Sequence, residues 1–129
     1  MNELRRILYV EDEPDIQAVA EIALEAVAGF TLKVCSSGEE ALAEAVAFAP
    51  DLLLLDVMMP NMDGPSTLLE LRKLPELANT PAMFMTAKVQ PQEIVHFKSL
   101  GAIEVIPKPF DPMSLGEQIK AAWQLHTKT

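Results

Sequence analysis

Hydrophobic and polar positions along this chain follow two alternating periods, one typical of β-strands and one typical of α-helices. Short runs that are apolar throughout, or that alternate with polar residues, predict five strands, at 6–10, 30–35, 51–55, 82–85 and 103–106. Apolar residues that recur every three or four positions predict helices at 14–27, 38–48, 91–100 and 112–126, with another around 68–71 after the loop 58–64. The predicted order is therefore a strand followed by a helix, repeated five times.

Residues that start and stop helices support these boundaries. Pro14 suits the first turn of a helix, Gly29 suits a helix end, and the sequence SGEE from Ser37 is typical of a capping box. The run 51–55 is apolar without alternation, as expected for a central strand that helices cover on both faces. Strands alternating with helices predict an α/β fold, a doubly wound parallel sheet with right-handed crossovers. Because these elements use the whole chain, 1–129 is expected to be a single domain.

The composition narrows the classes of protein to which this fold could belong. A formal net charge of -9 and a pI near 4.6 disfavour direct binding of nucleic acids or anionic membranes, which requires a positive surface. No apolar stretch approaches the ~18 residues that a membrane span requires. Cys35 is the only cysteine, so no disulfide can form within the chain. We expect a reduced, cytoplasmic setting, with neither a signal peptide nor a membrane span.

Side chains suited to chemistry follow four of the five predicted strands. Glu11 and Asp12 follow the first strand, Asp56 the third, Thr86 the fourth and Lys108 the fifth. The carboxyl ends of parallel strands meet at one edge of the sheet, where α/β proteins bind their ligands. We therefore expect these side chains to converge, although each of them alone is weak evidence of a site.

The three carboxylates in this group predict a bound cation. At about 5 Å and an effective dielectric constant of about 20, each pair of carboxylates repels by roughly 3 kcal/mol. Mg²⁺ prefers a few hard oxygen ligands together with phosphate oxygens, and it neutralises charge in phosphoryl transfer. A carboxylate can itself be the nucleophile and form an aspartyl-phosphate, which makes Asp56 the candidate acceptor. Lys108 and the hydroxyl of Thr86 could then contact phosphoryl oxygens.

Four pieces of the sequence closely resemble the receiver domain of bacterial response regulators: ILYVEDEP at 7–14, DLLLLDVMMPNMDG at 51–64, MTAK at 85–88 and PKPF at 107–110. The resemblance covers nearly the whole chain. It implies the flavodoxin-like strand order 2-1-3-4-5, which periodicity alone does not provide. It also implies a cis peptide bond between Lys108 and Pro109.

The resemblance further implies a role for each candidate residue. Asp56 would accept a phosphoryl group from a histidine kinase or a phosphotransfer protein, so that the chain acts as a phosphorylation-dependent switch of a two-component system. Thr86 and Lys108 would contact the phosphate. The Mg²⁺ ligands would come from the acidic residues Glu11, Asp12 and Asp56 and from the backbone carbonyl of Met58.

A downstream protein would bind the face formed by residues 91–100, 103–106 and 112–126. Many members of the family carry Tyr or Phe three residues before the lysine, where the ring moves when the threonine does, but here Val105 takes that position. A valine has few side-chain rotamers and cannot move in this way. We therefore expect phosphorylation to act mainly near the site and weakly on this distal face.

Two other functions remain open from the sequence. Haloacid-dehalogenase enzymes also phosphorylate an aspartate, but they need a second Asp two residues later as a general acid, and Met58 occupies that position. A binding module of the same fold that works without phosphorylation is the second alternative. We expect no enzyme activity beyond self-phosphorylation from small donors and autodephosphorylation.

Overall fold

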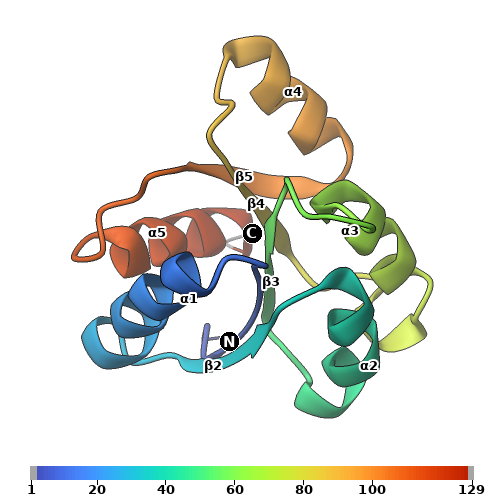
Figure 1. Cartoon of the computed structure of the whole chain (residues 1–129), viewed down its shortest axis with the longest axis horizontal. Coiled ribbons are helices and arrows are strands. Elements are labelled where there is room, and N and C mark those ends of the chain that lie inside the picture. Colours follow the sequence, from blue (N-terminus) through green and yellow to red (C-terminus); the bar gives the residue numbers. More distant parts are fainter. Residues whose placement is uncertain (1–2, 128–129) are drawn as a thin grey trace.

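The computed structural model describes residues 3–127, which form a five-stranded parallel sheet between two layers of helices (Figure 1). The strands are β1 (Arg6–Val10), β2 (Thr31–Cys35), β3 (Leu52–Asp56), β4 (Ala82–Thr86) and β5 (Ala102–Pro107). Their hydrogen-bonded order is β2-β1-β3-β4-β5, and every neighbouring pair is parallel. The predicted α/β fold class and the strand order 2-1-3-4-5 are therefore confirmed.

The helices cover both faces of the sheet. They are α1 (Pro14–Glu21), the π-helix η1 (Ile22–Val27), α2 (Gly38–Phe48), α3 (Gly64–Arg72), the 3₁₀-helix η2 (Pro75–Leu77), α4 (Pro91–Ser99) and α5 (Leu115–Thr127). One face packs against α1, η1 and α5, and the other packs against α2, α3 and α4 (Figure 1). None of the helices within residues 3–127 combines the length and the apolarity needed to cross a membrane.

Every residue of the central strand β3 is buried. Leu53 and Leu55 pack toward α2, α3 and α4, whereas Leu52 and Leu54 pack toward α1 and α5. All four leucines are fully buried, which explains why this strand is apolar without alternation. Close packing on both faces fixes the end of the strand, and that end carries Asp56.

The helix predicted over 14–27 changes its hydrogen-bond register partway. After α1, the chain continues as the π-helix η1, at the end of which the Ala28 N–H donates to the Ala23 carbonyl at 3.1 Å. The apolar spacing does not distinguish a π turn from an α turn over so short a segment. The end of η1 lies against α5, where a Cβ on Gly116 would be 2.4 Å from the Cβ of Ala28. Gly116 therefore allows the two helices to approach closely.

The last helix begins later than predicted, at Leu115 rather than at Pro112. The residues before it form a turn in which the Asp111 side chain accepts a hydrogen bond from the Met113 N–H at 3.0 Å. The Asp111 carbonyl accepts one from the Leu115 N–H at 2.9 Å. Pro112 therefore lies inside this turn, because the capping interactions of Asp111 precede the first regular helical turn.

Candidate functional site

The predicted site residues all lie at the carboxyl edge of the parallel sheet. Glu11 and Asp12 directly follow β1, and Lys108 directly follows β5. Asp56 and Thr86 are the last residues of β3 and β4 rather than the first residues after them, because both still pair with the neighbouring strand. The fold therefore brings residues from four strand ends to one place, as expected for a site in an open parallel sheet.

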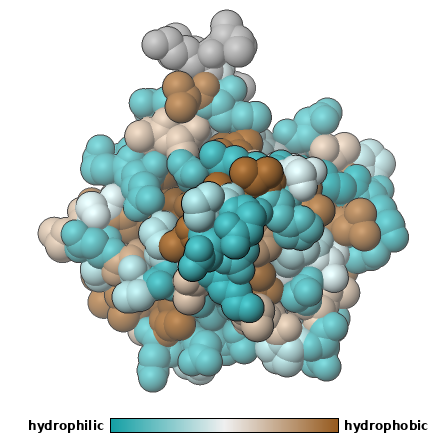
Figure 2. Space-filling model, turned by 90° about the horizontal axis from the view of Figure 1, so that it is seen from above, coloured by the Kyte–Doolittle hydropathy of each residue, from teal (hydrophilic) through white to brown (hydrophobic). Residues whose placement is uncertain are grey.

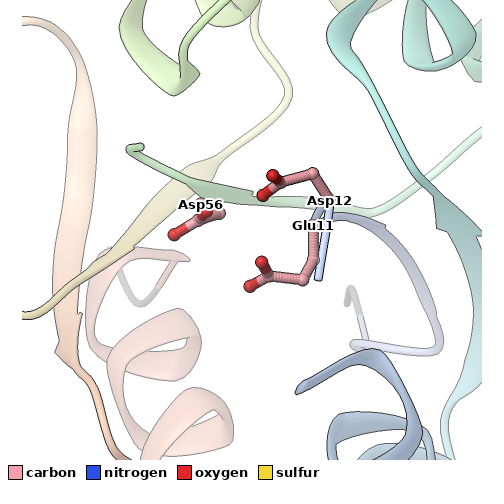
Figure 3. A group of neighbouring side chains, drawn as sticks. All are labelled: Glu11, Asp12 and Asp56. Atoms are coloured by element: carbon pink, nitrogen blue, oxygen red, sulfur yellow. The ribbon is translucent and has the colours of Figure 1, made fainter. Parts of the chain in front are cut away.

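Three carboxylates lie close together at this edge. One oxygen each from Glu11, Asp12 and Asp56 lies within 4.8 Å of the others. Figure 3 shows the three side chains pointing toward a shared space between the ends of β1 and β3. Glu11 is fully buried, and Asp56 is only 2% exposed. Placing these carboxylates together is costly because burial removes the water that would screen their repulsion.

Lys108 partly offsets this repulsion. Its Nζ donates to Asp56 Oδ1 at 2.9 Å and to Glu11 Oε1 at 3.1 Å, and both contacts are ion pairs. Asp56 and Glu11 are 52 and 97 positions away from Lys108 in the sequence, so only the folded chain brings the three residues together. One ammonium group faces three carboxylates, and the cluster keeps a surplus of negative charge.

The pKa values in the cluster reflect this balance. Burial and the charge of Asp56 raise the pKa of Glu11, although hydrogen bonds from Lys108 oppose the shift. Burial likewise raises the pKa of Asp56, against the effect of Lys108 and with an added contribution from the charge of Asp12. Burial acts to lower the pKa of Lys108, but its hydrogen bonds to Asp56 and Glu11 outweigh burial and raise it. Both carboxylates thus carry an energetic cost when they are ionised without a cation.

This cost predicts a pH dependence of stability in the absence of divalent cations. Folding raises the pKa of such a carboxyl group, so the group favours the folded state at low pH. Its contribution to stability is complete below the unfolded pKa and is lost as pH rises through the folded pKa. For Glu11 and Asp56 the loss begins above their usual values of 4.5 and 3.8. The native protein should therefore become less stable relative to Asp56→Asn as pH rises from about 5 to 7. Urea unfolding in chelator checks this, and a difference that stays constant with pH would contradict it.

The chemistry of this group fits a hard divalent cation. Asp12 Oδ1 is buried and has no hydrogen-bond partner among the described residues. A buried carboxylate oxygen without a donor is costly, and a cation would satisfy it. Carboxylate oxygens from few residues suit Mg²⁺, which retains several waters. The residues therefore fit a Mg²⁺ site. Met58, predicted to add its carbonyl, lies in the loop two residues after Asp56, and this role remains a prediction.

Thr86 lies at the same edge, on the strand next to Asp56. Asp56 pairs with Met85, so Thr86 is one residue further along the neighbouring strand. Its hydroxyl oxygen accepts a hydrogen bond from the Lys88 N–H at 3.1 Å, and the residue is 2% exposed. Because this bond uses the oxygen as acceptor, the hydroxyl hydrogen remains available for a ligand.

Two further residues support the site and were not identified from the sequence. The Tyr9 hydroxyl donates to Glu11 Oε1 at 3.3 Å, and burial raises the pKa of Tyr9, so the phenol stays a donor at neutral pH. Gln17 Nε2 donates to the Glu11 carbonyl at 2.5 Å and to Ser36 Oγ at 3.1 Å. The two-residue period of a strand places Tyr9 and Glu11 on one side, a pattern that could have identified Tyr9. No sequence pattern points to Gln17.

The backbone around the site is tightly arranged. The expected cis peptide bond between Lys108 and Pro109 is present. On the other side of the site, Asp63 caps α3 by accepting the Ser66 N–H at 2.8 Å. A Cβ on Gly64 would lie 2.4 Å from the Asp56 carbonyl oxygen. Gly64 therefore permits the start of α3 to lie directly against the end of β3.

Comparisons with known proteins agree with this geometry. Residues 7–120 match the family described as the response regulator receiver domain. The chain is 36% identical over 117 residues to the alkaline phosphatase synthesis transcriptional regulatory protein PhoP of Bacillus subtilis (strain 168), covering 91% of this chain and 48% of that protein. It is 37% identical over 118 residues to the transcriptional regulatory protein CpxR of Klebsiella pneumoniae, covering 92% of this chain and 49% of that protein. The chain thus spans about half the length of these relatives.

Solved structures give the same result at the level of the whole fold. The chemotaxis response regulator CheY4 of Vibrio cholerae superimposes with a TM-score of 0.84 at 28% identity, covering 93% of this chain and 99% of that one. A response regulator from Desulfuromonas acetoxidans superimposes with a TM-score of 0.82 at 27% identity, covering 94% of this chain and 98% of that one. Sequence profile, curated relatives and fold agree, and this chain belongs to the response regulator receiver domain family.

Proposed function

We propose that this chain is the phosphorylation-dependent switch of a two-component system. Asp56 accepts a phosphoryl group from a histidine kinase or a phosphotransfer protein with the help of Mg²⁺, and the chain then changes its partner-binding surface. The observation that carries the proposal is the contact of the Asp56 carboxylate with Lys108 beside Glu11 and Asp12. A carboxylate nucleophile beside a lysine and further acidic residues suits phosphoryl transfer to Asp56.

The residues of the site have distinct parts in the proposed transfer. A carboxylate oxygen of Asp56 attacks phosphorus while the bond to the donor's imidazole nitrogen breaks, and the imidazole then takes up a proton. Lys108 holds the Asp56 carboxylate in place and then pairs with the negative phosphoryl oxygens. The Thr86 hydroxyl donates to another phosphoryl oxygen. A bound Mg²⁺ supplies neutralisation of the charge on the phosphoryl group.

The direct test uses small phosphoryl donors and mimics. With Mg²⁺ and acetyl phosphate, the intact mass should increase by one phosphoryl group, and beryllofluoride should bind with one-to-one stoichiometry. A folded protein that takes up neither would contradict the proposal and favour a binding module that works without phosphorylation. The haloacid-dehalogenase alternative lacks support because Met58, with an exposed side chain, offers no general acid near Asp56. We therefore propose no enzyme activity beyond self-phosphorylation from small donors and autodephosphorylation.

The proposed Mg²⁺ site predicts a stabilising effect of the ion. Mg²⁺ should bind the folded chain preferentially, because unfolding separates Asp12 from Asp56. At a tenfold excess over the dissociation constant this adds about 1.4 kcal/mol, or roughly 4–8 °C in Tm. Asp12→Ala should remove most of this increase. Asp15→Ala removes an exposed carboxylate in the first turn of α1 and should leave it intact. Thermal unfolding across a millimolar Mg²⁺ titration checks this, and an unchanged native Tm would contradict it.

The proposed output surface is formed by α4, β5 and α5. Figure 2 views the molecule from the α4 side and shows a mainly hydrophilic face with scattered hydrophobic side chains. Val95 and Leu100, which are 68% and 43% exposed, lie on α4 and at its end. We propose that a downstream protein in the cytoplasm recognises this face. We also propose that this chain does not bind nucleic acid directly. The net charge of -9 supports a protein partner over nucleic acid.

Val105 limits how strongly phosphorylation changes this face. It is 6% exposed and packs in the same core cluster as Phe84 and Phe97. A buried valine has no alternative exposed position, so the coupling should fall near the lower end of the usual range of about 1–3 kcal/mol. Amide chemical shifts with and without beryllofluoride should change most after β3 and β4 and at the start of α4. A new Val105 rotamer together with the largest changes on α5 would contradict this prediction.

A further inference from the structure

Tyr9 is the one tyrosine of the chain, and it is fully buried in the middle of the sheet. Its neighbours across β1 are Val34 on β2 and Leu54 on β3. A buried phenol needs a hydrogen-bond partner for its hydroxyl. The only partner among the described residues is Glu11, whose Oε1 lies 3.3 Å from the Tyr9 hydroxyl. The Tyr9 ring is therefore part of the core, and its hydroxyl faces Glu11 of the candidate site.

Glu11 depends on a small number of donors. It is fully buried, and a buried carboxylate is tolerated only where hydrogen bonds replace its water. Oε2 accepts the Glu13 N–H at 3.2 Å, whereas Oε1 accepts both Tyr9 and Lys108. Of the two side-chain donors, Lys108 has a long flexible side chain, whereas the Tyr9 ring is fully buried in the core.

Lys108 is shared between two carboxylates, and this sharing cannot persist unchanged. Its Nζ contacts Asp56 at 2.9 Å and Glu11 at 3.1 Å. When Asp56 carries a phosphoryl group, the negative charge moves outward onto the phosphoryl oxygens. An ammonium group that follows this charge lengthens its contact with Glu11, and the Tyr9 hydroxyl is then the remaining side-chain donor to Glu11 Oε1 among the described residues.

We propose that Tyr9 is a positioning residue that holds the Glu11 carboxylate in place when Lys108 transfers its hydrogen bond from the carboxylate pair to the phosphoryl group. The inference rests on the proposed phosphorylation of Asp56 and concerns the phosphorylated state of the same site. Tyr9 contributes little before phosphorylation, because Lys108 then serves the same oxygen. It contributes more afterwards, because no other side chain among residues 3–127 donates to Glu11.

The first test compares Tyr9→Phe with a matched removal of a hydroxyl elsewhere. Thr67→Val removes a buried hydroxyl on α3 that has no hydrogen-bond partner among the described residues. Beryllofluoride mimics the phosphoryl group, and its affinity is measured by calorimetric titration at fixed Mg²⁺. Tyr9→Phe should weaken beryllofluoride binding by roughly threefold to tenfold, as expected for the net contribution of one ordinary hydrogen bond. Thr67→Val should leave the affinity unchanged.

The second test removes Lys108 and measures stability without any ligand. In the native background, Tyr9→Phe should shift the urea midpoint little, since Lys108 still donates to Glu11. In a Lys108→Met background, the Tyr9 hydroxyl is the remaining side-chain donor to Glu11 Oε1. Tyr9→Phe should then lower the urea midpoint by at least twice as much as in the native background. This non-additivity is a property of shared partners and would not arise from loss of packing alone.

The outcomes separate this inference from the proposed function. If the native protein fails to bind beryllofluoride, the proposed function is wrong and this inference falls with it. If the native protein binds normally but Tyr9→Phe binds equally well, the inference alone is overturned. Additive effects of Tyr9→Phe and Lys108→Met on the urea midpoint would overturn it as well.

Discussion

Replacing Asp56 with Asn should abolish phosphoryl uptake while the fold stays intact. Asn has nearly the same shape as Asp, but its amide is not a nucleophile toward phosphorus. Asp56 ends the fully buried strand β3, so the substitution leaves the packing of that strand unchanged. With acetyl phosphate and Mg²⁺, intact mass should show no added phosphoryl group. Circular dichroism and urea unfolding should show a native fold.

The same substitution should leave stability unchanged or raise it. The carboxylate of Asp56 lies in a cluster where three carboxylates face one ammonium group, and burial raises its pKa. Removing this charge relieves repulsion from Glu11 and Asp12, while the Asn oxygen can still accept a hydrogen bond from Lys108. The unfolding free energy without divalent cations should therefore lie between the native value and about 1 kcal/mol above it.

The control for Asp56→Asn is the same substitution just before the opposite end of β3. Asp51 accepts hydrogen bonds from the backbone N–H groups of Arg5 and Arg6 at 3.0 and 2.9 Å, far from the site in the fold. Asp51→Asn keeps an oxygen acceptor there and should accept a phosphoryl group from acetyl phosphate as the native protein does. Stoichiometric, acid-stable labelling of Asp56→Asn would show that the phosphoryl acceptor is another residue.

Gly64→Ala should destabilise the protein more than any other single methyl addition near the site. The added Cβ would lie 2.4 Å from the Asp56 carbonyl oxygen and 3.0 Å from the Cα of Val57. Both are backbone atoms of the segment that carries the candidate acceptor, so they cannot move without shifting the site. Overpacking of this kind costs about 1–3 kcal/mol. We expect urea unfolding to show this loss and phosphoryl uptake to slow.

A second glycine provides the comparison. A Cβ on Gly116 would also lie at 2.4 Å from another atom, but that atom is the Cβ of Ala28, and the next nearest atoms are at 3.6 and 3.9 Å. Gly116→Ala should therefore be destabilising alone and partly restored by Ala28→Gly. Gly64→Ala has no such compensating substitution because it meets backbone. Native-like stability of Gly64→Ala would show that the loop after β3 adjusts freely, contrary to this prediction.

The sequence by itself determined the elements and the edge of the sheet that carries the chemistry. Strand and helix periods are local properties, so the alternation of strands and helices could be predicted without knowing their contacts. Parallel strands share a common direction, and that geometry alone places Asp12, Asp56 and Lys108 at one edge. The strand order came from the family resemblance, because alternation is compatible with several orders.

Tertiary structure decided the details that depend on contacts between distant residues. The sharing of Lys108 between Glu11 and Asp56 joins residues 97 and 52 positions apart, and no local pattern specifies those distances. The π-helix η1 and the late start of α5 depend on packing and turn hydrogen bonds rather than on apolar spacing. The proposed role of Tyr9 depends on both sequence and tertiary structure. Strand alternation places Tyr9 and Glu11 on the same side of the sheet. Only folding buries Glu11 with so few hydrogen-bond donors that one phenol hydroxyl contributes to holding it.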